Sequence, residues 1–397
     1  MMKKTVLFLI SALLTVGVFA QKPSLTKAYN SFYDKDYDKA KVQIDLCAAD
    51  EKLSAKAQTW LYKGNIEFLL ANREYSAMQK DESYKTKYPD APEAAFDAFE
   101  RALSLNPKVE ALDMMPAQDA LKQLYPYLLI SGVNSLLEKD YHAAKRILEK
   151  GIQSYEMDKP QYPMNGDLYY YYAYTLEMLG DTVEMLRNYR KALDDGTKNP
   201  YVFSKLLDVY KRNNDRQNAE KVIQSAKKSS IDEVNMRMLE TDYAFWSGDS
   251  ARASALLGSI DESRLNSADE LVNVSNFYIK EKRYKDADKL LRRANAIEPG
   301  NFVVLYNLGV CNYRLSEEYF ELQNRLSLKN SAKEEIDNAR NISSEYLLNA
   351  AGFFEMANEL QPGDLNLLYT LRSIYVRQQD KDKEDKIESQ IKKLENK

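Results

Sequence analysis

"AAFDAFERALSLNP", residues 94–107, places a small residue at Ala95, an aromatic ring at Phe99, a second small residue at Ala102 and a proline at Pro107. The three-and-four spacing predicts one face of an α-helix. Alanines on that face allow a second helix to approach closely, and the proline ends the helix because it cannot continue the hydrogen-bond ladder. The stretch therefore predicts one helix of a tightly packed pair.

The same order of residues returns elsewhere in the chain. "NAAGFFEMANELQP" (349–362) and "ADKLLRRANAIEP" (287–299) repeat the small, large, small, proline order. Turn markers recur at a constant interval, as "GD" at 180–181, "ND" at 214–215 and "GD" at 248–249. Apolar positions between these markers predict helix, turn and helix, and such a hairpin needs stacked neighbours to bury its apolar face.

A helical hairpin repeated with a period of about 34 residues resembles the tetratricopeptide repeat (TPR) family. "FVVLYNLGVCNY" (302–313) supports the resemblance with Leu305, Leu308 and Gly309 at the spacing of the family's first helix. The resemblance implies an all-α superhelical solenoid of stacked antiparallel hairpins. About nine hairpins would cover residues 21–397.

Three regions depart from the repeat. Extra residues stretch two hairpins, near 71–93 and 315–348, and the polar C-terminus predicts a capping helix. The second insertion keeps helical spacing. Two interpretations stay open for it: a hairpin with both helices lengthened, or a mobile surface loop.

The N-terminus predicts a cleaved secretory signal over residues 1–20. Lys3 and Lys4 precede an apolar run from Val6 to Ala20, and the chain turns polar at Gln21. The apolar run is shorter than the roughly 20 residues of a membrane-spanning helix. We therefore expect an exported protein, in the periplasm or secreted, that is not inserted in a membrane after cleavage.

Composition and charge argue against several function classes. Without Lys3 and Lys4, 54 basic residues face 60 acidic ones, which gives no support for nucleic-acid binding. The single histidine, His142, excludes paired-histidine metal ligation, and no phosphate-binding loop or nucleophile elbow is present. Cys47 and Cys311 both lie in apolar-periodic stretches, which favours two buried free thiols. We expect no enzyme activity and no cofactor.

The tyrosine run in "DLYYYYAYTLEMLGD" (167–181) divides between two faces of one helix. Tyr169, Tyr172 and Leu176 match the family's packing positions, while the adjacent stripe is the one that lines the concave groove in this family. The groove residues implied by the resemblance are Tyr170, Tyr174, Phe245, Trp246, Asn276, Lys280, Tyr306, Tyr313, Arg314, Tyr369 and Arg377.

These residues predict a non-catalytic scaffold of the bacterial cell envelope that binds a partner peptide or helix. Tyr, Trp and Arg are the residue types that concentrate binding energy. The alternative is a glycan-binding module. Tyrosines beside Asp and Asn would suit sugars, and the Arg and Lys of the C-terminal groove favour acidic peptides instead. We expect Tyr306, Tyr313, Arg314, Tyr369 and Arg377 to share one surface and to point away from the stack. The family's two-carboxylate clamp is not expected, because Val272 and Tyr306 occupy its lysine or helper positions.

Overall fold

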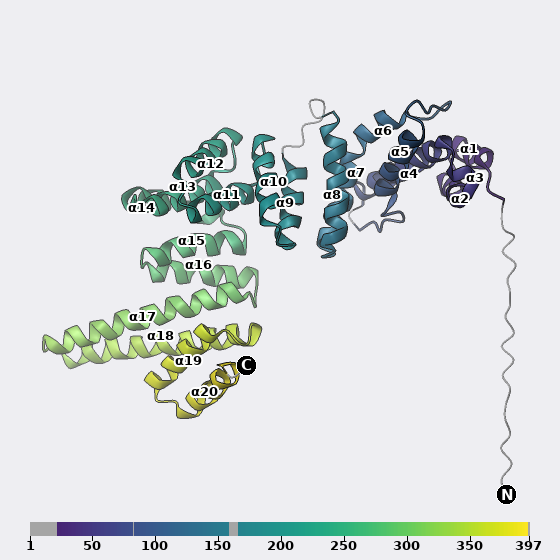
Figure 1. The fold of residues 1–397 in the computed structure, drawn as a ribbon. Helices are drawn as coiled ribbons and strands as arrows, with labels where there is room; N and C mark the ends of the chain where they lie inside the picture. Colours follow the sequence, from purple (N-terminus) through teal and green to yellow (C-terminus); the bar gives the residue numbers. More distant parts are fainter. Residues whose placement is uncertain (1–21, 82, 159–165, 396–397) are drawn as a thin grey trace, which may run out of the picture. The chain divides into compact units, whose positions relative to one another are not determined.

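A computed structural model describes residues 22–81, 83–158 and 166–395. They form two compact units that divide between Thr197 and Lys198. All regular secondary structure among the described residues is helical (Figure 1). The predicted signal segment, residues 1–20, lies outside the described residues.

The described part of the N-terminal unit contains four antiparallel helix pairs and two short connecting helices. The pairs are α1 (Leu25–Tyr33) with α2 (Tyr37–Ala49), α4 (Ala57–Met78) with α5 (Ala91–Leu105), α7 (Tyr125–Leu137) with α8 (Tyr141–Glu156), and α9 (Asp167–Met178) with α10 (Thr182–Asp194). The connecting helices are α3 (Glu51–Ser54) and α6 (Ala117–Gln123).

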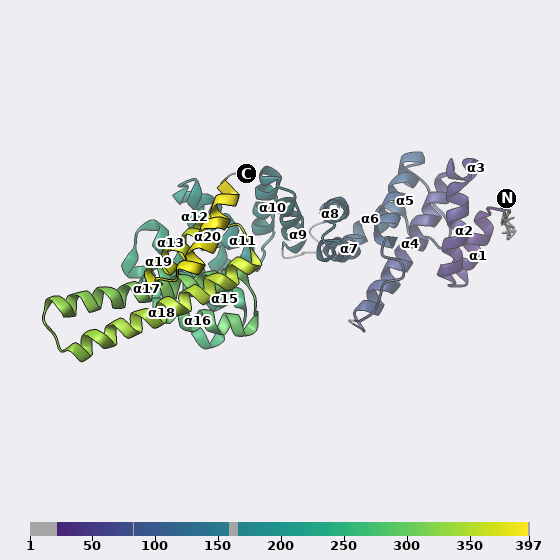
Figure 2. The same ribbon diagram turned by 90° about the horizontal axis from the view of Figure 1, so that it is seen from below.

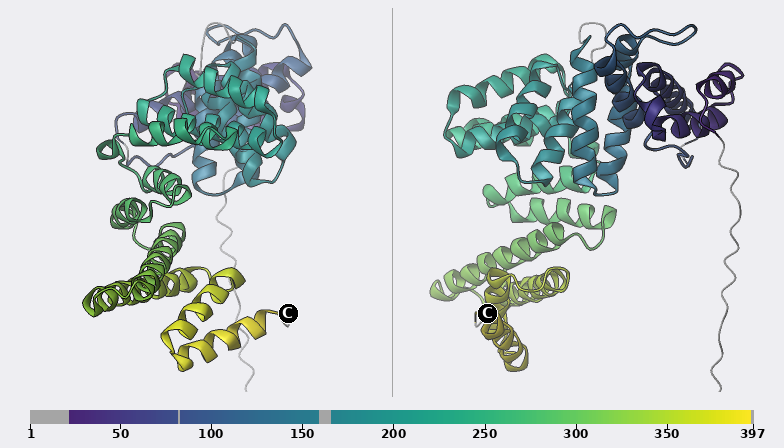
Figure 3. Two further views of the ribbon diagram at one scale, coloured as in Figure 1. Left: turned by 90° about the vertical axis from the view of Figure 1, so that its left-hand side faces the viewer. Right: turned by 45° about the vertical axis from the view of Figure 1, so that its right-hand side comes forward.

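The C-terminal unit contains five further pairs in its described part. They are α11 (Pro200–Arg212) with α12 (Arg216–Ser229), α13 (Glu233–Ser247) with α14 (Ser250–Gly258), α15 (Ala268–Lys280) with α16 (Tyr284–Ile297), α17 (Phe302–Leu328) with α18 (Lys333–Leu360), and α19 (Leu365–Gln378) with α20 (Lys381–Glu395). A short 3₁₀ turn, η2 (Glu262–Arg264), precedes α15. In Figure 3 the green and yellow hairpins of this unit follow one another in chain order.

The repeated turn markers have a structural cause. Gly180, Asn214 and Gly248 all have positive φ, between 53° and 87°, a left-handed conformation that glycine and asparagine adopt most readily. The aspartate that follows each of them caps the second helix by accepting a hydrogen bond from a backbone N–H three residues on. The two-residue marker therefore ends one helix and begins the next.

Close helix crossings account for the small residues. A Cβ atom added to Gly64 would lie 2.6 Å from the ring of Phe99. Ala95 and Ala102, on either side of that phenylalanine, are fully buried, as is Ala287 in α16. At these positions a larger residue would occupy the space that the side chain of the paired helix fills.

The second insertion forms a long helical hairpin. α17 has 27 residues and α18 has 28, and the chain reverses over residues 329–332. Figure 2 shows this hairpin extending beyond its neighbours. The second insertion therefore lengthens both helices of the hairpin and does not form a surface loop. In the first insertion α4 continues to Met78, and the described residues that lead to α5, 79–81 and 83–90, are not helical.

The prediction of an all-α fold of stacked TPR-like hairpins is confirmed within each unit, while a superhelical course for the whole chain stays a prediction. Cys47 and Cys311 are buried and free, as expected. Within the described ranges no helix combines the length and the apolar character that crossing a bilayer requires.

Candidate functional site

A groove crosses the first helices of three successive hairpins in the C-terminal unit. It has a volume of about 540 Å³ and lies on α11, α13 and α15. We call it the α11–α15 groove. Its lining includes Tyr201, Ser204, Asp208, Asn235, Met238, Asp242, Asp269, Val272, Asn273, Asn276, Phe277 and Lys280.

The lining side chains form rows with the spacing of the repeat. One repeat separates each member of a row from the next, and the rows are Tyr201, Asn235 and Asp269; Ser204, Met238 and Val272; and Asp208, Asp242 and Asn276. Equivalent positions on stacked hairpins lie side by side, so each row runs from helix to helix. The groove therefore offers a repeated polar and apolar pattern to one elongated ligand.

The groove has an apolar floor and polar walls. Met238, Val272 and Phe277 are more than nine-tenths buried and form part of the floor. Asn273 and Asp269 are exposed on α15. A ligand can thus bury apolar groups between the helices while its polar groups bond to amides and carboxylates.

Two lysines neutralise part of the acidic wall. Lys211 forms ion pairs with Asp242 and, at 3.0 Å, with Asp208, and the Lys280 ammonium lies 3.7 Å from Asp242. Burial alone would lower the pKa of Lys211, but its hydrogen bond to Asp242 raises that pKa above the ordinary lysine value. Glu270 is occupied in the capping box of α15 with Ser267. The four carboxylates of the lining, Asp208, Asp242, Asp269 and Glu270, outnumber Lys211 and Lys280, which leaves the groove with a net negative charge.

Two of the predicted site residues, Asn276 and Lys280, line this groove. The Asn276 carbonyl oxygen accepts a hydrogen bond of 3.0 Å from the Asn307 amide, which links α15 to α17. The Lys280 ammonium lies 5.4 Å from the ring centre of Phe277 and 5.6 Å from that of Phe245. The rings of Phe245 and Phe277 stack at 5.8 Å, so Phe245 supports Lys280 from beneath. Phe245 is not among the groove-lining residues.

Trp246 lies apart from the groove lining. Its ring is 5.9 Å from the guanidinium carbon of Arg216 on α12 and 5.9 Å from the ring of Tyr243. The next residue along α13 is rotated by about 100° around the helix, which turns Trp246 toward the second helix of the preceding hairpin.

The five C-terminal residues do not all converge. Arg377 on α19 lies 5.7 Å above the ring of Tyr313 on α17, so these two come together. Tyr369 donates a hydrogen bond to Glu395, and Arg314 pairs with Glu317 of its own helix.

Tyr306 does not point away from the stack as predicted. Its ring packs edge-on against Phe354 at 5.7 Å and stacks on Phe302 at 5.9 Å. Both rings lie in or beside the core that α17, α18 and α19 share. Phe354 of α18 thus lies against Tyr306 where the prediction required open space.

The tyrosine run in α9 divides between two faces as expected. Tyr169, Tyr172 and Leu176 are buried, which confirms their role in the core. Burial raises the pKa of Tyr172 to about 12. Tyr170 is half-buried, and its ring lies 6.3 Å from that of Tyr174. These two belong to the N-terminal unit and not to the α11–α15 groove.

The sequence analysis missed most of the groove. Tyr201, Asp208, Asn235, Asp242 and Asn273 all line it. The repeat itself was the available signal, since stepping back by one repeat from Asn276 leads to Asp242 and a second step leads to Asp208.

No group of three His, Cys, Asp or Glu side chains in the described parts of the chain is arranged to hold a metal ion. His142, the second residue of α8, is exposed.

Comparison with known proteins adds a likeness of fold. No family model matches the chain, and no curated protein matches it. Yeast Tom70 is similar in structure, with a TM-score of 0.43 and 14% identity, over 93% of this chain and 91% of that one. A tetratricopeptide repeat protein from Parabacteroides merdae has a TM-score of 0.45 and 10% identity, over 78% of this chain and 98% of that one. These likenesses concern the fold alone.

Proposed function

We propose that the chain is a non-catalytic scaffold that binds an extended segment of a partner protein in the α11–α15 groove. The observation that carries the proposal is the alignment of lining residues, one repeat apart, on three adjacent helices. Packed helices lie about 8–10 Å apart, so the rows span roughly 16–20 Å. About five or six extended residues cover that length at roughly 3.3 Å each.

The groove chemistry suits a polypeptide. The amides of Asn235, Asn273 and Asn276 can donate to and accept from an extended backbone, because each carries both kinds of group. The floor of Met238 and Val272 accepts apolar side chains. The surplus of carboxylates favours a segment that carries lysine or arginine, in contrast to the acidic peptide that the sequence analysis favoured.

A glycan is the second candidate ligand, and one observation favours it. Tyr201, 37% exposed, lies in the lining together with Asp208 and Asn235, and aromatic faces beside acids and amides also suit sugars. A single exposed ring at one end of the groove offers less stacking surface than a chain of sugars uses. The protein partner therefore remains the first candidate.

We propose a cell-envelope location for this scaffold. The support is the signal-like pattern of residues 1–20, with two lysines, an apolar run and a polar residue at Gln21. N-terminal sequencing of material recovered from the envelope tests it, and an intact Met1 there would contradict it.

Site-specific crosslinking tests the groove. A photo-crosslinking amino acid replaces Asn273, which is exposed in the groove, and, as control, Glu220, which is exposed on α12. A partner that crosslinks from position 273 and not from position 220 supports the proposal. Equal crosslinking from both positions contradicts it. Binding on a glycan array that Tyr201→Ala abolishes, with no protein crosslinked at 273, would favour the second candidate.

A further inference from the structure

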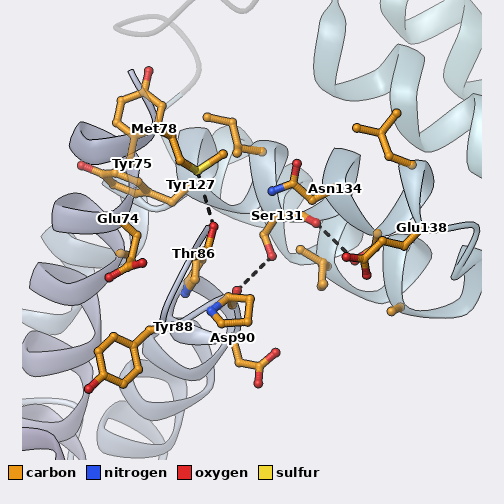
Figure 4. Close-up of a pocket in the computed structure, with 18 of the residues that line it drawn as sticks. Glu74, Tyr75, Met78, Thr86, Tyr88, Asp90, Tyr127, Ser131, Asn134 and Glu138 are labelled. Atoms are coloured by element: carbon orange, nitrogen blue, oxygen red, sulfur yellow. Dashed lines mark hydrogen bonds between the residues drawn. The ribbon is translucent and has the colours of Figure 1, made fainter. Parts of the chain in front are cut away.

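The N-terminal unit contains a cavity of about 680 Å³ that the proposed function does not use. It lies between the end of α4, the segment 83–90, α7 and the start of α8 (Figure 4). None of its lining residues belongs to the α11–α15 groove.

One wall of the cavity comes from the first insertion, and hydrogen bonds fix that wall. The Glu74 carboxylate accepts a hydrogen bond of 2.6 Å from the backbone N–H of Lys87. The Lys87 ammonium bonds to Asp38 on α2 at 3.1 Å, and the Ser131 hydroxyl donates to the Pro89 carbonyl at 3.3 Å. The segment 83–90 is thus attached on both sides, so the cavity is a built part of the unit.

The opposite wall is one face of α7. Tyr127, Ser131, Asn134 and Glu138 recur at three- and four-residue intervals and line the cavity. In Figure 4, Tyr127 and Glu138 lie at opposite ends of this row. At 1.5 Å rise per residue the row is about 16 Å long, the length of about five residues of extended chain. The cavity therefore suits an elongated ligand.

The cavity is apolar toward α4 and α8. Tyr75 and Tyr127 meet edge to face at 5.5 Å, and Met78 and Ile147 complete this part of the lining. At the other end of α7, Leu137 also lines the cavity and is 77% exposed. Covering the Leu137 side chain with a ligand would remove apolar surface from water, which favours binding.

The charges at the rim are predominantly negative. Asp90 and Glu138 are exposed, and neither has a hydrogen bond or ion pair from its side chain within the described part of the chain. Arg146 adds little positive charge, because two of its nitrogens bond to Glu93 at 2.7 and 3.1 Å. Lys85 remains as a rim cation against the carboxylates of Asp90, Glu138 and Asp140.

We propose that this cavity binds an extended segment of a partner protein in which large apolar and basic side chains alternate. Successive side chains of an extended chain point to opposite sides. One set would then enter the apolar space between α4 and α7, and the other would reach Asp90 and Glu138 at the rim. Charge complementarity with the rim selects lysine and arginine over acidic residues.

Fluorescence anisotropy with two labelled peptides tests the proposal on the full chain. One seven-residue peptide alternates leucine and lysine, and the other alternates leucine and glutamate. The expected result is binding of the lysine peptide, weakened by added salt, and no binding of the glutamate peptide. Equal binding of both peptides, or binding of neither, overturns the proposal.

Matched variants locate the binding. Asp90→Asn with Glu138→Gln removes both rim charges and is expected to weaken the lysine peptide about tenfold. Glu110→Gln with Glu149→Gln, two exposed acids outside the cavity lining, is the control and should change nothing. Leu137→Lys places a cation in the cavity and should also weaken binding about tenfold. Leu112→Lys, at a leucine that is 79% exposed and outside the lining, should not.

All these positions are exposed, so circular dichroism should report the same helix content for every variant. Weakening by the control pair as large as that by the rim pair would overturn the assignment to this cavity. Displacement of the lysine peptide by an uncharged detergent, together with unchanged affinity in the rim variant, would instead assign the cavity to small apolar molecules and overturn the protein segment.

Discussion

Gly309 of α17 lies directly against the ring of Phe354 of α18, so closely that a Cβ atom on the glycine would be 2.6 Å from the ring. Phe354 is 2% exposed, which leaves its ring no room to turn away. Gly64 and Phe99 have the same relationship in the N-terminal unit. This contact fixes how closely the two helices of a hairpin approach.

Gly309→Ala is expected to destabilise the C-terminal unit by about 1–3 kcal/mol, because the added methyl group overpacks the crossing. Gly352→Ala is the matched control, since a Cβ there meets no heavy atom within 4 Å. It should stabilise α18 by about 0.5–1 kcal/mol through helix propensity. Urea unfolding followed by circular dichroism measures both. A Gly309→Ala protein as stable as the control would mean that the crossing is loose.

Tyr306→Ala should cost about 2 kcal/mol of stability, because it removes a ring that packs on Phe354 and Phe302. Tyr369→Ala should cost less than about 1 kcal/mol, because that ring is 42% exposed and bonds only to the exposed Glu395 among the described residues. Thermal unfolding of the two variants gives the comparison. Equal losses would show that Tyr306 is not part of the core.

The stability of the N-terminal unit should depend on Asp38 below about pH 4. The hydrogen bond from Arg73 lowers the pKa of the Asp38 carboxyl from 3.8 to about 2. The unfolded chain takes up this proton first as the pH falls, so the stabilisation is present above the unfolded value and is lost toward pH 2. The Asp38 side chain is 44% exposed, and solvent screening limits the effect to about 1 kcal/mol or less.

Asp38→Asn should therefore be less stable than the wild type at about pH 6 and equal to it at about pH 2. Asp34→Asn, at an exposed residue that ends α1, serves as control and should follow the wild type throughout. Urea midpoints across this pH range provide the measurement. A constant difference between Asp38→Asn and wild type at every pH would rule out the ion pair as the cause.

Neither cysteine should react with a thiol reagent in the folded protein. Burial raises the pKa of Cys311 to about 12 and also raises the pKa of Cys47, and the thiolate is the reactive form. Ellman's reagent at about pH 8 should label neither thiol in native protein and both in denaturant. Rapid labelling of the native chain would show that one of the two helices opens readily.

The parts of the fold that could be predicted depend on local geometry. A turn marker such as Gly180-Asp181 predicts a left-handed residue followed by a helix cap. Both features depend only on residues that are adjacent in the sequence. The small residues beside Phe99 report a helix crossing for the same reason. The second insertion keeps helical spacing. Spacing alone could not distinguish a hairpin with lengthened helices from a mobile surface loop.

The groove could be predicted only in part, because a groove depends on how far each helix is rotated. Asn276 and Lys280 line the α11–α15 groove, while Trp246, taken from the same stripe, faces α12. Tyr306 was expected to face open space, but its ring packs against the ring of Phe354. The position of Trp246 follows from its rotation around α13, and that of Tyr306 follows from the large ring on the opposing helix; residue spacing alone gives neither.

The long α17–α18 hairpin has a consequence for grafting. Its two helices are lengthened by nearly equal amounts. The ends of α17 and α18 that contact α16 and α19 therefore keep the alignment of an ordinary hairpin. The reversal at Lys329, Asn330, Ser331 and Ala332 is far along the chain from those ends, and Leu328 beside it is 84% exposed. A foreign domain inserted between Asn330 and Ser331 would lie at the end of the hairpin and would not alter the packing of the stacked helices. This turn is therefore a suitable site for inserting a reporter protein.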